Sequence, residues 1–119
     1  MRQPFRRPVL KTAALTISAI LATWTVAAAA AGDIERGKQL FAVCAACHGP
    51  NAEGMQEMNA PALAGREEWY LKRQLANFKS GIRGGDSRDT YGRQMAPMAQ
   101  ILQDDQAIAD VAAYLSSLK

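Results

Sequence analysis

Cys44, Cys47 and His48 are the residues of this chain best suited to specific chemistry, and they fall within five positions of one another. The 119 residues include two cysteines and one histidine, so this stretch holds the whole supply of both types. Thiolates and imidazoles act as nucleophiles and as ligands for soft or borderline metals. Their concentration at one point indicates a single site that uses all three side chains together.

Three kinds of site compete for the C-x-x-C-H pattern. A thioredoxin-like redox pair requires a βαβ context, and alternating β-type patterns are absent from the sequence. A structural zinc site requires four ligands, whereas three ligands within five residues can hardly surround an ion. Covalent haem attachment remains, and C-x-x-C-H is its sequence mark.

Haem attachment also explains the spacing. Cys44 and Cys47 are nearly one helical turn apart, so both thiols can add to the two vinyl groups along one side of a porphyrin. His48 follows directly, which holds its imidazole under the ring as an iron ligand. The sequence therefore predicts one haem c, bound covalently through Cys44 and Cys47.

The second axial ligand of such an iron is predicted to be a methionine, because there is no second histidine. A thioether sulfur suits haem iron, and a Met/His pair raises the reduction potential. Met55 and Met58 would have to wrap round the ring edge at once, so they are expected to fill gaps or lie exposed. Met95 and Met98 both remain candidates from the residues alone.

Helical periodicity predicts the elements that must position these groups. Residues 33–46 form one predicted helix capped by Asp33, residues 67–80 form a second that ends at Gly81, and a third begins near Asp104 or Asp105. Glycine and proline predict loops over 49–65 and 81–97. The expected fold class is all-α, with three main helices and long loops wrapped around one haem. Helices this short bury little surface, so a flat apolar cofactor would complete the core.

The N-terminal third does not resemble the rest of the chain. Residues 1–11 are basic without an acid, and residues 12–31 carry no charge and end in small side chains. This pattern predicts a secretory signal peptide over 1–31, cleaved near Ala30 or Ala31, and a mature domain over 32–119. The alternative is an uncleaved membrane anchor, because twenty apolar residues can just span a bilayer. Weak hydrophobicity and the lack of a basic stop signal argue against it.

The positive charge of the chain belongs to this leader. The whole sequence has 14 basic and 11 acidic residues. Without the leader's four basic residues, ten basic and eleven acidic residues remain, a formal net charge of −1. A nucleic-acid partner is therefore not expected.

The sequence resembles the class I c-type cytochromes, which are small single-haem electron carriers. The resemblance covers essentially the whole mature chain and rests on "GKQLFAVCAACHGPNAEG", "APALAG" and "QMAPMAQILQDDQAIADVAAYLSSL". The middle segment "YLKRQLANFKSGIRGG" is similar to one half of the bacterial two-haem cytochromes and to cytochrome domains fused to oxidase subunits.

The resemblance implies roles for further residues. The family ligand lies seven residues before the leucine that opens the last helix, which favours Met95 before Leu102, whereas the spacing in other members favours Met98. Pro61 matches the proline whose carbonyl accepts a hydrogen bond from the second imidazole nitrogen of His48. The resemblance also implies that Leu63 packs near the haem. Gly37, Phe41 and Tyr114 match the site where the first and last helices of the family cross. Side chains that could bond the haem propionates are Trp69, Tyr70, Arg73, Gln74, Arg83 and Arg93.

The expected function is that of a periplasmic single-electron carrier and not of an enzyme. The alternative is a haem-bearing electron-transfer subunit of a dehydrogenase or terminal oxidase complex. An open-site haem enzyme such as a peroxidase is disfavoured, because no distal histidine exists. Redox proteins are the expected partners, a membrane is involved only if the leader stays uncleaved, and a monomer is expected.

Overall fold

The computed structural model describes residues 31–119, so the predicted signal peptide lies almost wholly outside the described residues. The elements are α1 (Ile34–Phe41), α2 (Ala45–His48), the 3₁₀ helix η1 (Gln56–Met58), α3 (Glu68–Lys79), α4 (Thr90–Gln100) and α5 (Asp105–Ser117). Within the described part there is no strand, only an isolated bridge between Met55 and Ala60. The all-α class expected from the sequence is confirmed.

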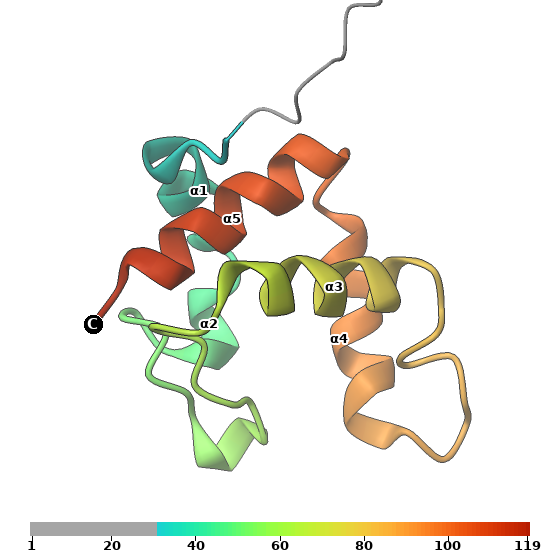
Figure 1. The fold of residues 1–119 in the computed structure, drawn as a ribbon. Coiled ribbons are helices and arrows are strands. Elements are labelled where there is room, and N and C mark those ends of the chain that lie inside the picture. Colours follow the sequence, from blue (N-terminus) through green and yellow to red (C-terminus); the bar gives the residue numbers. More distant parts are fainter. Residues whose placement is uncertain (1–30) are drawn as a thin grey trace, which may run out of the picture.

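The first and last helices cross at close range (Figure 1). Gly37 is buried at the crossing, and a Cβ placed there would overlap the carbonyl oxygen of Asp110. The rings of Phe41 and Tyr114 pack beside it with centroids 5.6 Å apart. Glycine therefore permits the approach, and the two aromatic residues fill the adjoining space. This is the crossing that the resemblance implied.

The core is centred on α5, whose apolar face meets α1 on one side and α3 on the other. Asp104 caps α5 by accepting a hydrogen bond from the N–H of Ala107, 2.7 Å away, which confirms the predicted start of this helix. The larger apolar side chains of the core are Phe41, Leu71, Leu102, Ile108, Val111 and Leu115, each at most 5% exposed. They form the wall behind the functional site.

Two of the predicted boundaries are wrong. The helix expected over 33–46 stops at Phe41, and a turn over residues 42–44 separates it from α2. The loop expected over 81–97 ends instead at Asp89, which caps α4 by accepting from the N–H of Gly92. Gly92 and Pro97 lower the helix propensity of this segment, but packing of α4 against α3 outweighs it.

A buried carboxylate ties the start of α1 to α5. Asp110 is fully buried, and its Oδ1 accepts hydrogen bonds from the Asp33 backbone N–H and from Gln106, both at 2.8 Å. Its Oδ2 lies 2.6 Å from the guanidinium of Arg36. Burial alone would raise the pKa of Asp110, but these hydrogen bonds and the Arg36 charge outweigh burial and leave the pKa below its ordinary value.

This network predicts an acid-sensitive contribution to stability. Because the folded pKa of Asp110 is lowered, its contribution is present above the unfolded value of about 4 and is lost as the pH falls toward the folded pKa. We expect Asp110→Asn to cost about 1–3 kcal/mol at pH 7, since it leaves a buried N–H without its acceptor. Urea unfolding from pH 7 to pH 2 measures both effects. If the free energy of unfolding fell equally steeply with pH below pH 4 in the wild type and in the variant, the lowered pKa of Asp110 would be contradicted.

Candidate functional site

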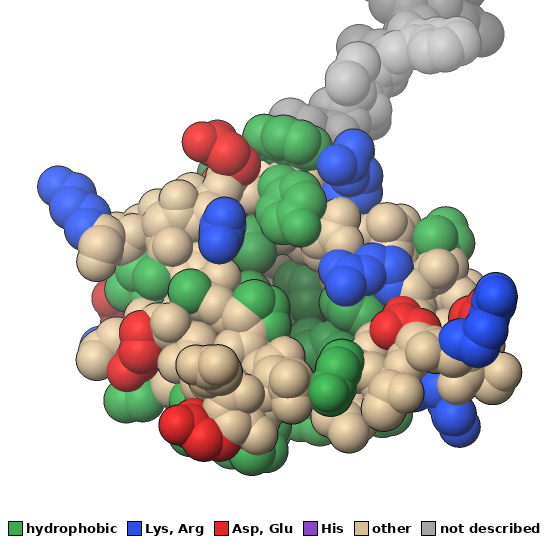
Figure 2. Space-filling model, turned by 90° about the horizontal axis from the view of Figure 1, so that it is seen from below, with side chains coloured by type: hydrophobic (Ala, Val, Ile, Leu, Met, Phe, Trp, Pro, Cys, Tyr) green, Lys and Arg blue, Asp and Glu red, His purple; other side chains and the backbone are tan. Residues whose placement is uncertain are grey.

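A cavity of about 510 Å³ opens on one face of the molecule, where Figure 2 shows a hollow lined by hydrophobic side chains. Its walls come from α2 and the turn before it, from the loop around Pro61, and from α3 and α4. The structure brings together all the ligand and attachment candidates of the sequence except Met55. The predicted ligand and attachment residues that line it, with the two residues of the proline loop, are Cys44, Cys47, His48, Met58, Pro61, Leu63, Met95 and Met98.

His48 is held in one orientation. The residue is 7% exposed, and its Nδ1 lies 2.8 Å from the carbonyl oxygen of Pro61. Because a carbonyl can only accept, Nδ1 carries the proton and donates, which leaves the lone pair of Nε2 free to bind a metal. The hydrogen bond that the sequence implied between these two residues is therefore present, and it selects the tautomer that a metal ligand requires.

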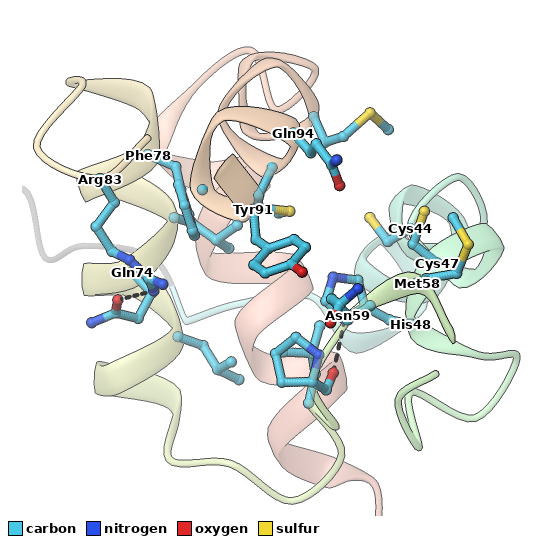
Figure 3. A pocket seen from close by; sticks show the side chains of 18 of the residues that line it. Cys44, Cys47, His48, Met58, Asn59, Gln74, Phe78, Arg83, Tyr91 and Gln94 are labelled. Atoms are coloured by element: carbon cyan, nitrogen blue, oxygen red, sulfur yellow. Dashed lines mark hydrogen bonds between the residues drawn. The ribbon is translucent and has the colours of Figure 1, made fainter. Parts of the chain in front are cut away.

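The two cysteines lie on the same side of the cavity as His48 (Figure 3). They do not form a disulfide, and both are half-buried. Burial raises the pKa of the Cys44 thiol above its ordinary value, so this thiol is neutral at neutral pH before any attachment. Neither sulfur is tied up in a disulfide, so both are available for attachment.

The methionines differ in their relation to the cavity. Met95 and Met98 are both half-buried on α4 and both line it, because residues three apart share one face of a helix. Met58 lines the rim near the cysteines (Figure 3). It is 47% exposed, and Met55 does not line the cavity. Two methionines therefore line the cavity from one helix.

Of the six candidate propionate partners, half line the cavity. Tyr70, Gln74 and Arg83 do so, and the Arg83 guanidinium donates to Gln74 Oε1 at 2.6 Å while it packs over Phe78. Trp69, Arg73 and Arg93 do not line the cavity. Arg66 does, although the sequence analysis missed it. The one feature of the sequence that could have indicated Arg66 is its position directly after the "PALAG" loop, residues 61–65.

The donor set and shape suit a haem. One imidazole with a free Nε2, two thiols three positions apart and two thioethers converge on a cavity whose volume is typical of small-molecule sites. Leu71, Leu75 and Phe78 give an apolar wall for a flat ring. In residues 31–119 no group of three His, Cys, Asp or Glu side chains is placed to hold an ion.

Residues 34–119 match the family model described as Cytochrome c. The chain belongs to the cytochrome c family. A covalently bound haem c follows from this membership, and the spacing of Cys44, Cys47 and His48 fits the attachment motif.

Two relatives illustrate the range of lengths. Cytochrome c4 of Azotobacter vinelandii is 41% identical over 92 residues, which are 76% of this chain and 43% of that protein. Cytochrome c-554(548) of Halomonas halodenitrificans is 38% identical over 87 residues, 73% of this chain and 98% of that protein. The chain thus spans less than half of the first relative and nearly all of the second. Both relatives are named as cytochromes.

Crystallography supports the fold independently. The structure of reduced recombinant cytochrome c4 from Pseudomonas stutzeri matches with a TM-score of 0.59 over 76% of this chain and 53% of that one. At 24% identity this likeness concerns the fold alone. It agrees with the helical architecture of Figure 1.

The site predicts that the haem stays with the polypeptide. We expect acid–acetone extraction to leave the haem of the exported wild type bound, because thioether bonds survive acid. Single variants Cys44→Ser and Cys47→Ser should each keep one bond, whereas the double variant should release its haem. Mass spectrometry measures the added mass in each case. Haem that extracts freely from the wild type, or a mass equal to the bare chain, would refute covalent attachment at these cysteines.

Proposed function

We propose that this protein is an exported, periplasmic single-electron carrier in which His48 and Met95 bind the iron of a haem attached through Cys44 and Cys47. The observation that carries the proposal is the buried His48 ring, whose Nδ1 is engaged by Pro61 at 2.8 Å while Nε2 is left for a metal. The haem supplies one reversible electron at its iron. The chain supplies both axial ligands and a largely apolar enclosure.

Occupation of both axial positions favours electron transfer over substrate chemistry. An iron held by an imidazole and a thioether has no open position for a substrate. The chain offers two suitable methionines and, with its one histidine engaged, no distal histidine of the kind that an open-site haem enzyme commonly uses. A Met/His pair also gives a high reduction potential for a haem.

The choice of Met95 over Met98 rests on the sequence register. Met95 lies seven residues before Leu102, the buried leucine that precedes the last helix. Pro97 separates the two methionines, so Met95 belongs to the first turns of α4 and Met98 to its end. We assign Met98 to packing against the edge of the ring.

The rim of the cavity suits brief contact with redox partners. Val43, Met58 and Tyr91 line the cavity and are also 44%, 47% and 55% exposed. An apolar rim of this kind fits the small, transient interfaces of electron-transfer proteins. The partners are redox proteins, either as donor and acceptor of a free carrier or as neighbours in a dehydrogenase or oxidase complex.

Export is the part of the proposal that rests on the sequence alone. Residues 1–31 have the basic head, uncharged stretch and small-residue end of a secretory signal, and we propose that they are removed. Between residues 31 and 119, the structure contains no helix with the length and apolar character needed to cross a membrane.

The ligand assignment predicts opposite results for two substitutions. Met95→Ala should abolish the far-red sulfur–iron charge-transfer band of the oxidised protein, lower the potential and let carbon monoxide bind the reduced iron. Met98→Ala should keep the band. It should lower the free energy of unfolding by less than the loss of about 2–5 kcal/mol that is typical of truncating a fully buried methionine, because Met98 is half-buried. Met58→Ala, at the exposed rim, is the matched control. A band lost in Met98→Ala and kept in Met95→Ala would move the ligand to Met98.

A further inference from the structure

Asp89 joins two backbone segments at the start of α4. Its Oδ1 accepts a hydrogen bond from the Gly92 N–H at 2.9 Å, and its Oδ2 accepts one from the Gly84 N–H at 3.0 Å. The first bond is ordinary helix capping. The second reaches back five residues and fastens the preceding loop to the helix, so capping alone does not account for it.

The two glycines show that this junction is closely built. Gly84 has φ +74°, and a Cβ there would overlap the carbonyl oxygen of Gly92 and come within 2.9 Å of the Ala96 side chain. A Cβ at Gly92 would overlap the Asp89 carboxylate. We call Gly84, Asp89 and Gly92 the Asp89 clasp. It has no room for a side chain at either glycine, so the loop lies directly on the helix backbone.

The clasp holds the part of α4 that carries Met95. Pro97 has no N–H, so the helical hydrogen bond to the Arg93 carbonyl is missing and the helix is weakened there. Beyond Pro97, the helix is tied to the end of α3, because Gln100 donates to the Lys79 carbonyl at 2.9 Å. Before Pro97, the Asp89 clasp has the corresponding role, because it ties the start of α4 to the preceding loop.

Asp89 also borders the site itself. It lines the same cavity as Met95 and is half-buried. Figure 3 shows Tyr91 and Gln94, from the turns that follow the clasp, at the cavity. A loosened clasp would therefore release the helical turns next to the ligand, while His48 and the cysteines, on α2 and the turn before it, would stay in place.

We propose that Asp89 is a positioning residue for the methionine ligand: by joining Gly84 to Gly92, it holds the first turns of α4 so that the Met95 sulfur stays on the iron. This rests on the proposed function, in which Met95 is the ligand. Loss of one hydrogen bond to a carboxylate shifts a local equilibrium by a factor of about five to thirty. The open state, with the sulfur away from the iron, should be enriched by that factor.

The test compares Asp89→Asn with Asp86→Asn in the holoprotein. Asparagine keeps one acceptor oxygen and loses the other, so one clasp bond must break. Asp86 lies in the same loop, and among residues 31–119 its side chain bonds only to Arg88, so its variant removes the same charge without touching the clasp. We expect carbon monoxide to bind reduced Asp89→Asn about five to thirty times faster than the wild type, with Asp86→Asn unchanged.

A third variant separates the clasp from capping. Asp89→Ser keeps an acceptor for the Gly92 N–H but is too short to reach Gly84 as well. We expect the Gly84 amide to exchange its hydrogen faster in Asp89→Ser than in Asp86→Asn. In Asp89→Asn, one of the two amides of Gly84 and Gly92 should exchange faster. The far-red band should also disappear at a lower temperature in both Asp89 variants.

The outcomes distinguish the two proposals. Unchanged Gly84 exchange in Asp89→Ser, or carbon monoxide binding to Asp89→Asn that is no faster than to Asp86→Asn, would overturn the role of Asp89. A change in potential alone would also overturn it, since that would be an effect of charge and not of position. A wild type without the sulfur–iron band would instead refute the methionine ligand. In that case, the amide exchange would still decide whether the clasp holds α4.

Discussion

The hydrogen bond from His48 to the Pro61 carbonyl is the interaction on which the chemistry of the cavity depends. It fixes the ring and its tautomer together, since Nδ1 must donate and Nε2 must then carry the lone pair. Every other feature of the site is arranged around that nitrogen. The cysteines lie beside it, the apolar side chains of α3 supply a wall, and the methionines approach from α4. Without this bond the ring could rotate, and the cavity would be an apolar pocket without a defined metal ligand.

The parts of the site that were predictable from the sequence are those encoded locally. Cys44, Cys47 and His48 lie within five positions, so their mutual placement needs only one short turn of backbone. Asp33 was recognisable as a cap, and the last helix was expected to start near Asp104 or Asp105, because a carboxylate just before an apolar helical pattern favours a helix start. The resemblance added Pro61, whose partner is thirteen residues away and could not be found by periodicity.

The parts that were missed depend on tertiary contact. Helix α4 contains Gly92 and Pro97, which local propensity interprets as a loop, yet packing on α3 and the cap from Asp89 stabilise it. Arg66 lines the cavity only because the loop around Pro61 turns its chain toward α3. Neither feature can be found from the periodicity of apolar residues in the sequence. The same limitation applies to Asp110, whose burial follows from the crossing of α1 and α5 and not from its own neighbours in sequence.

The two sides of the cavity are therefore held by different means. On the histidine side, α2 is short, but a covalent ring, a buried imidazole and the Pro61 carbonyl hold it in the proposed holoprotein. On the methionine side, α4 is a complete helix that depends on noncovalent ties at its two ends, on either side of Pro97. Segments with few ties open locally at a lower free energy than the core around α5. In the proposed holoprotein, the methionine bond would thus be the adjustable half of the iron site, and contacts such as those of Asp89 would determine how firmly the proposed ligand is kept.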